Sequence, residues 1–319
     1  MNGQSVSSET NGLWAIVLAG GEVVALRRLM EELYGEDWPE ALATVVGSGS
    51  LLRQTLERVR LAVPFDRTLV ATVKPHADAV AEALDGAPVR RVLIQPEDKG
   101  TAAALLLSAH WVSSWDPDAT VAVFPSDHFI PEGQRFMDHV ADLAEMVSEH
   151  PEWVILVTAT PTEPEADYGW VEPGELVGWT PAGEPVSRVR RFWEKPSHAE
   201  ARRCQDKGWL WSTFVLVAKA SRLLEVADQI VPRLNGRLSL LVPFRETALE
   251  APALQQAYAL TRKESFARSV LEACPPGLML SRLPPVAWSD WGTSGRVIKS
   301  LQAARLLPRW LANCLTVEP

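Results

Sequence analysis

The chain has 319 residues, of which 47% are hydrophobic and 22% are charged, a composition that suits one large globular domain. Its formal net charge of −9 argues against a nucleic-acid partner, because such proteins carry a basic surface. No apolar run reaches the roughly 20 residues of a membrane span, and the polar start lacks the basic and apolar regions of a signal peptide. The three cysteines show no metal-ligand spacing. We therefore expect a cytoplasmic protein with no membrane association.

Buried strands and amphipathic helices alternate through the first half of the chain. Short apolar runs bounded by turn residues predict strands at 14–18, 68–73, 89–94, 120–124 and 153–158. Helical spacing of apolar residues predicts helices at 50–63, 77–84, 101–111 and 136–149. Strands separated by such helices form βαβ units, so we expect an α/β fold with a Rossmann-like, doubly wound, mainly parallel sheet that is covered on both faces.

The second half is less regular. Strands at 168–177 and 186–193 read as a small β meander around Gly174 and Gly183, and a further strand is expected at 209–218. Residues 223–266 are mostly helical, and helical spacing returns at 295–315. We expect a flexible N-terminus over residues 1–12, one domain over 13–301 and a helical C-terminal tail over 302–319.

Ligands of such sheets bind beyond the carboxyl ends of the strands, which directs attention to the turns after Leu18 and Phe124. The first turn, Leu18 to Gly21, has small residues that let a backbone approach a ligand, and its N–H groups can cradle phosphates. A plain tight turn explains this turn equally well. It is no dinucleotide fingerprint, because no G-x-G-x-x-G follows, and a nicotinamide enzyme is disfavoured.

Seven motifs follow one another along the chain. They read Leu18-Ala19-Gly20-Gly21, Ser50-Leu51-Leu52-Arg53-Gln54-Thr55-Leu56-Glu57-Arg58, Gln95-Pro96 with Gly100-Thr101-Ala102, Phe124-Pro125-Ser126-Asp127-His128, Tyr168-Gly169-Trp170-Val171-Glu172-Pro173-Gly174, Phe192-Trp193-Glu194-Lys195-Pro196 and Trp288-Ser289-Asp290-Trp291-Gly292. In this order the chain resembles the sugar-phosphate nucleotidyltransferases, and most of all their mannose-1-phosphate guanylyltransferase (GDP-mannose pyrophosphorylase) branch. The resemblance covers residues 14–301 and implies a nucleotidyltransferase, GT-A-like fold.

The resemblance implies a reaction in which a sugar-1-phosphate attacks the α-phosphate of a nucleoside triphosphate and releases pyrophosphate. Such chemistry depends on positioning and on neutralising charge. By resemblance, Asp127 and Asp290 are ligands of Mg²⁺, which suits hard oxygen donors. The plainer readings are a turn-capping Asp127 and a surface Asp290.

The resemblance also assigns substrate contacts. Lys195 would hold the sugar phosphate and Glu194 the sugar hydroxyls, although an exposed ion pair would look the same in the sequence. The resemblance also implies that Gln95 with Gly100 faces the base and that Gly169 and the position of Ser212 touch the sugar. The remaining substrate-binding positions are Leu18, Gly20, Gly21 and Thr101. His128 is expected to be a packed or turn-capping histidine.

The loop after the two glycines departs from the family. Val23, Val24 and Ala25 stand where the family has glycine, threonine and arginine, and Glu40 stands at its lysine. Valines resist positive φ and crowd the phosphates, and alanine removes a bidentate phosphate donor. At ~5 Å and an effective dielectric of ~20, the charge reversal at the lysine position is worth about 6 kcal/mol per phosphate charge before screening.

Other residues bear on this loss. Arg27, Arg28 or Lys99 could reach the phosphates in place of the missing cations. At Ser212 the family has an asparagine that touches the sugar, so the identity of the sugar stays open.

Two functions follow. The first is transfer of GMP from GTP to a hexose-1-phosphate such as mannose-1-phosphate, with Mg²⁺ if the protein is active and with impaired catalysis, since Ala25 and Glu40 replace the signature cations. The alternative is a non-catalytic homologue that binds a nucleotide sugar, or regulates a catalytic partner subunit, alone or as a homo-oligomer.

Overall fold

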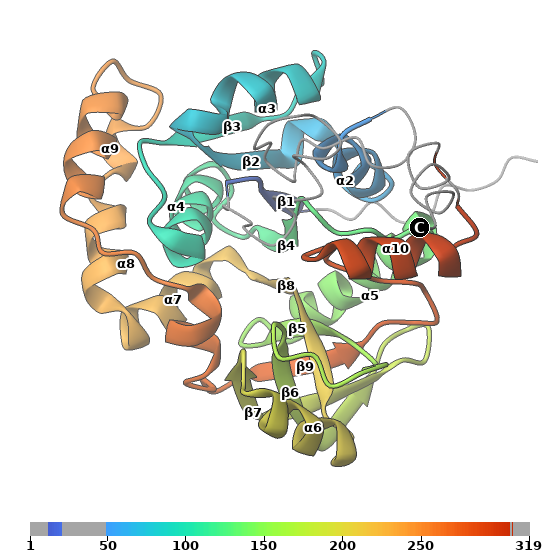
Figure 1. Ribbon diagram of the computed structural model, residues 1–319. Helices are drawn as coiled ribbons and strands as arrows, with labels where there is room; N and C mark the ends of the chain where they lie inside the picture. Colours follow the sequence, from blue (N-terminus) through green and yellow to red (C-terminus); the bar gives the residue numbers. More distant parts are fainter. Residues whose placement is uncertain (1–11, 21–48, 307, 309–319) are drawn as a thin grey trace, which may run out of the picture.

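The computed structural model describes residues 12–20, 49–306 and 308, and within them nine strands form one sheet (Figure 1). The strands are β1 Leu13–Leu18, β2 Thr68–Val73, β3 Arg91–Gln95, β4 Thr120–Pro125, β5 Val154–Ala159, β6 Gly169–Trp179, β7 Pro185–Glu194, β8 Leu210–Lys219 and β9 Leu278–Arg282. Their order across the sheet is β3-β2-β1-β4-β8-β5-β9-β7-β6.

The sheet is parallel in its first part and mixed beyond it. Strands β3, β2, β1 and β4 are parallel neighbours, and β5 is parallel to β9. Strand β8 enters antiparallel between β4 and β5. The predicted α/β class is therefore confirmed, while the parallel pairing is concentrated in the βαβ units of the first half.

Strand β8 joins the two parts of the sheet. Near Lys219 it pairs with β4, and at Leu210 and Trp211 it pairs with β6 instead. Between these stretches Phe214 has φ +59°, in the left-handed region, and the register with β5 shifts. The pairings of β8, β5, β9, β7 and β6 consequently close on themselves into a small ring.

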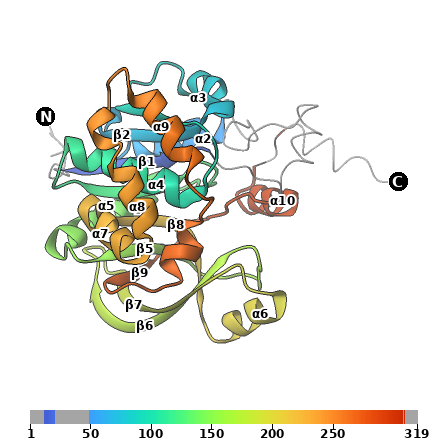
Figure 2. The ribbon, with the colours of Figure 1, turned by 90° about the vertical axis from the view of Figure 1, so that its left-hand side faces the viewer.

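Helices cover both faces of the sheet (Figures 1 and 2). Their bounds are α2 Leu51–Val59, α3 Ala77–Leu84, α4 Gly100–Trp115, α5 Gly133–Glu149, α6 His198–Asp206, α7 Ala220–Ile230, α8 Pro232–Ser239, α9 Glu250–Ala259 and α10 Ser294–Ala303. One apolar core unites the sheet with α4, α7, α8 and α9, and a second unites it with α2, α3 and α5. Helix α4 is buried along residues 102–112, as expected for a helix that is apolar all round.

Several elements differ from their predicted bounds. Strand β9 was not predicted, because its five residues alternate weakly and its partner β5 lies far away in the sequence. The predicted helix at 295–315 is observed as α10, Ser294–Ala303, and most of the proposed tail 302–319 and of the start 1–12 lies outside the described residues. None of the described helices has the length and apolarity required to cross a membrane.

Candidate functional site

Asp127 and Asp290 come together at the carboxyl ends of β1 and β4. Strand β4 continues the register of β1, and the N–H of Ser126 donates to the carbonyl oxygen of Leu18 at 3.1 Å. Just beyond, Phe129 and Ser289 form an isolated antiparallel bridge. This bridge ties the turn that carries Asp127 to the segment that carries Asp290, as the family resemblance implies for two residues of one site.

The two carboxylates influence each other. Asp127 is half-buried, and burial, together with the charge of Asp290, raises the pKa of Asp127 to about 7. Burial is the larger cause, because a carboxylate loses hydration there. A cation or a phosphate-bearing ligand that approaches this turn therefore meets a carboxyl group poised near neutral pH.

Asp290 already accepts several hydrogen bonds. The hydroxyl of Tyr168 donates to its Oδ1 at 2.8 Å, the N–H of Gly292 donates to Oδ1 at 3.0 Å, and Nη1 of Arg296 lies 3.1 Å from Oδ1 and 3.2 Å from Oδ2. Arg296 is only 7% exposed. Burial opposes its charge, but Asp290 and Tyr168 more than offset that effect and raise the pKa of Arg296.

This arrangement disfavours a divalent ion shared by the two aspartates. Oδ1 of Asp290 accepts three hydrogen bonds and has no lone pair left for a metal, while Oδ2 accepts one, from the positively charged Arg296. The described residues include no group of three or more His, Cys, Asp or Glu side chains placed to hold a metal, and Asp127 with Asp290 makes only two. The Mg²⁺ role of Asp127 and Asp290 stays a prediction.

Glu194 and Lys195 reach the same region from the end of β7. Glu194 pairs with Gly169 across the β6–β7 ladder, and the N–H of Lys195 donates to the carbonyl oxygen of Tyr168 at 3.2 Å. Burial raises the pKa of Glu194, opposed by the charges of Lys195 and Arg268. The predicted sugar-phosphate pair is thus connected through Tyr168 to Asp290.

Gly169 and Ser212 lie beside this pair. A Cβ at Gly169 would come within 2.8 Å of the Phe192 ring and 2.9 Å of Oε2 of Glu194, so contacts within the chain already require the glycine. Ser212 is buried in β8, and its Oγ accepts a hydrogen bond from the N–H of Phe214. Their sugar contacts stay predictions.

The predicted base contacts Gln95 and Gly100, and the substrate-binding position Thr101, also have partners within the chain. Gln95 is buried, its Nε2 donates to the carbonyl oxygen of Thr72, and its Oε1 accepts from the hydroxyl of Tyr258. Gly100 has φ +83° and lies against the backbone of Glu264. The hydroxyl of Thr101, an exposed residue, accepts from the N–H of Phe266 at 2.9 Å.

The phosphate loop is described only at its start. Leu18 and Gly20 lie at the end of β1, where a Cβ on Gly20 would contact Val73. Lys99 is paired with Glu97 at 3.1 Å. The other loop positions considered for phosphate binding lie outside the described residues: Gly21, Val23, Val24, Ala25, Arg27, Arg28 and Glu40.

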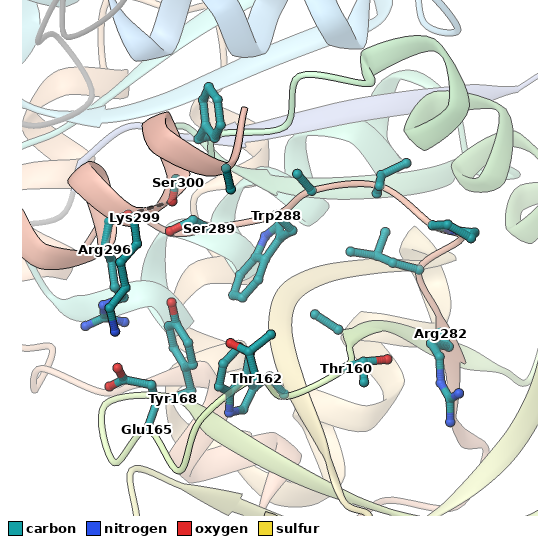
Figure 3. Close-up of a pocket in the computed structure, with 18 of the residues that line it drawn as sticks. Thr160, Thr162, Glu165, Tyr168, Arg282, Trp288, Ser289, Arg296, Lys299 and Ser300 are labelled. Carbon is teal, nitrogen blue, oxygen red and sulfur yellow. Dashed lines mark hydrogen bonds between the residues drawn. The ribbon is translucent and has the colours of Figure 1, made fainter. Parts of the chain in front are cut away.

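A cavity of about 650 Å³ adjoins the aspartates beneath α10 (Figure 3). Arg296 and Lys299 descend from α10 on one side of it, Trp288 stands near its middle, and Arg282 lies at the opposite end. Its wall shares Tyr168 and Arg296 with the aspartate site.

Sequence reasoning quoted Tyr168 and Trp288 in motifs but gave them no role, and it missed Arg296. The neighbouring Gly169 could have drawn attention to Tyr168. His128 is buried, with its ring edge-on to Trp288, which is the packed position expected of it.

Comparison with known proteins decides the family. The pattern described as "Nucleotidyl transferase" matches residues 14–304. The chain belongs to this family. The relationship to sugar-phosphate nucleotidyltransferases that the seven motifs indicated is thereby confirmed.

Similar proteins show how much of the chain, and of each relative, the sequence similarity covers. The alginate biosynthesis protein AlgA of Pseudomonas fluorescens is 27% identical over 281 residues, which cover 87% of this chain and 56% of AlgA. The putative mannose-1-phosphate guanylyltransferase of Vibrio cholerae is 23% identical over 292 residues, which cover 87% of this chain and 58% of that protein. The chain thus spans little more than half the length of these relatives.

Solved structures share the fold. A protein of Thermus thermophilus described as a mannose-1-phosphate geranyltransferase superposes with a TM-score of 0.74 at 26% identity and covers 88% of this chain and 76% of its own. This nucleotidyl transferase therefore has the fold that the motifs implied.

Proposed function

We propose that this nucleotidyl transferase binds a guanosine nucleotide and mannose-1-phosphate, as a mannose-1-phosphate guanylyltransferase does, and that it transfers GMP to the sugar phosphate poorly. The observation that carries the proposal is a chain of contacts: the backbone N–H of Lys195 donates to Tyr168, and the hydroxyl of Tyr168 donates to Asp290, whose charge acts on Asp127. The relatives' names supply the nucleotide and the sugar.

Each residue has a role that its chemistry allows. The exposed ammonium of Lys195 would neutralise the sugar phosphate, and the half-buried carboxyl of Glu194 would accept hydrogen bonds from sugar hydroxyls. Orientation and charge neutralisation of this kind supply most of the catalysis in phosphoryl transfer. Ala25 and Glu40 remove such neutralisation at the triphosphate, which is why we propose weak transfer.

A rescue experiment tests this proposal. The change is Val23→Gly, Val24→Thr, Ala25→Arg and Glu40→Lys together, assayed by pyrophosphate release from GTP and mannose-1-phosphate beside the parent. We expect turnover to rise by about 10³-fold or more, the range for a restored transition-state arginine. The same four changes with Lys195→Ala are the matched control and should lose the gain.

Two outcomes would contradict the proposal. A parent that already turns over as fast as the restored protein would show that the loop is not impaired. Absence of turnover in the restored protein, together with no thermal stabilisation of either protein by GDP-mannose, would show that the ligands are wrong.

A non-catalytic role is the second candidate, and the pairing of Asp290 with Arg296 favours it. Such a homologue would bind a nucleotide sugar and act on a catalytic partner subunit or within a homo-oligomer. In either role we place the protein in the cytoplasm, where Cys204 and Cys274, free in the structure, would remain thiols.

A further inference from the structure

We infer that Arg296 is a built-in counter-ion that takes the place of a divalent cation on Asp290, so that ligand binding at this site does not depend on a metal. The inference rests on the proposed function only for the identity of the ligand. It concerns the charge of the site, which the described residues define.

The guanidinium matches the carboxylate in position and charge. Nη1 of Arg296 contacts both oxygens of Asp290, and the hydroxyl of Tyr168 completes the set around Oδ1. The side chain of Arg296 is 8% exposed and that of Asp290 25% exposed, so solvent screens this pair less than a surface pair. A fixed positive charge therefore already balances Asp290.

Two further contacts hold the guanidinium in place. It lies over the ring of Tyr168, 4.6 Å from the ring centroid, which is cation–π geometry. Its Nε donates to Oγ1 of Thr293, the residue that also caps α10. These contacts fix the orientation of the Arg296 side chain along its length.

The intervening glycine permits the pair. A Cβ at Gly292 would come within 3.1 Å of Oδ2 of Asp290 and 3.3 Å of Nη2 of Arg296. The N–H of Gly292 donates to the same carboxylate. Asp290 and Arg296 therefore form an ion pair within one short segment, and α10 holds the arginine at the site.

A metal on Asp290 would have to displace this arginine or bind at Oδ2 beside its positive charge. Displacement would leave a buried guanidinium with Asp167, whose side chain is 64% exposed, as its remaining ion-pair partner among the described residues. Breaking a buried pair from one side is costly, because the remaining charge loses its compensation. We therefore expect weak metal binding at Asp290 in the native chain.

Manganese binding to the purified full-length protein tests the inference, with free Mn²⁺ followed by electron paramagnetic resonance. Arg296→Gln should bind Mn²⁺ about tenfold or more tightly than the native chain, because it removes a positive charge that competes with the metal for Asp290. Lys299→Gln is the matched control, because Lys299 lies on the same helix but pairs with Glu163, and it should bind as the native chain does. Adding Asp290→Asn to Arg296→Gln should abolish the gain.

Stability gives a second measurement. Arg296→Gln should have a lower Tm than the native chain in EDTA and regain stability in Mn²⁺, whereas the native Tm should not respond to Mn²⁺. If Arg296→Gln fails to fold, the single variant Asp290→Asn provides the test. Its Mn²⁺ affinity should equal that of the native chain, because Asp290 does not bind the metal there. Native Mn²⁺ binding as tight as that of Arg296→Gln, or loss of native binding in Asp290→Asn, would overturn the inference.

Nucleotide-sugar binding separates this inference from the proposed function. GDP-mannose should raise the Tm of the native chain equally with Mg²⁺ and with EDTA. A shift that requires Mg²⁺ would overturn the inference. No shift in either condition, with the Mn²⁺ results as expected, would leave the counter-ion in place and count against the proposed ligand.

Discussion

Glycines near the candidate site make room for the protein itself. At Gly169 the space is taken by Phe192 and Glu194, at Gly292 by Asp290 and Arg296, and at Gly100 by the backbone of Glu264. In the sequence Gly100 and Gly169 suggest close approach of a ligand, because a missing Cβ says nothing about what fills the space. The structure fills it from within the chain at all three positions.

Gly100 gives a direct test of this reading. At φ +83°, a Cβ would be strained and would clash with the carbonyl oxygen of Glu264. We expect Gly100→Ala to lower the free energy of unfolding by about 2–4 kcal/mol, measured by urea denaturation without ligand.

The control for Gly100→Ala is Gly236→Ala in α8. A Cβ there meets no atom within 4 Å, and alanine in a helix should add about 0.5–1 kcal/mol. If Gly100→Ala were as stable as the native chain in the absence of ligand, packing within the chain would not require the glycine. Close approach of a ligand would then be the reason for it.

At the scale of elements, α10 connects a helix cap to the chemistry of the site. Oγ1 of Thr293 accepts from the backbone N–H of Arg296 and from its Nε, both at 3.3 Å. The hydroxyl therefore fixes both the first turn of the helix and the guanidinium that pairs with Asp290. A cap elsewhere, such as Ser197 on α6, fixes only its own helix.

Comparison of the two caps separates the effects. Thr293→Ala and Ser197→Ala should each lower the free energy of unfolding by about 1 kcal/mol, because each leaves helix N–H groups without a side-chain acceptor. Only Thr293→Ala should also tighten Mn²⁺ binding, and by less than Arg296→Gln does. Equal Mn²⁺ affinity of the two cap variants would show that Thr293 does not position the arginine.

The sequence predicted the elements that follow local rules and missed those set by distant partners. The βαβ rule placed the turns after Leu18 and Phe124 at one edge, and the structure joins them there. Nothing local indicated β9, whose partner β5 is remote, or the bend of β8 at Phe214 that closes the ring.

The same limit applies to side chains at the site. By resemblance Gln95 is a base contact, but its side-chain oxygen accepts from the hydroxyl of Tyr258, which no local pattern relates to it. Arg296 lies six residues after Asp290, a separation that fixes no geometry until α10 and its cap are in place. Residue types could be predicted from the motifs, whereas their partners required the fold.

The stability of the whole molecule should depend on pH through a histidine far from any motif. His139 in α5 is 3% exposed, and neither ring nitrogen has a hydrogen-bond partner among the described residues. Burial lowers its pKa to about 4, against about 6.5 in the unfolded chain. Because the folded pKa is the lower one, the contribution of His139 is complete above about pH 6.5 and is lost as the pH falls toward 4.

The expected loss between pH 7 and pH 4.5 is about 2–3 kcal/mol of unfolding free energy from this residue. His139→Leu should remove that part of the acid destabilisation, because leucine occupies the same apolar surroundings without a group to protonate, whereas His198→Leu at the exposed start of α6 should not. Urea unfolding of the three proteins at both pH values measures the difference. If His139→Leu loses as much unfolding free energy at low pH as the native chain, other buried groups cause the acid destabilisation and His139 does not contribute to it.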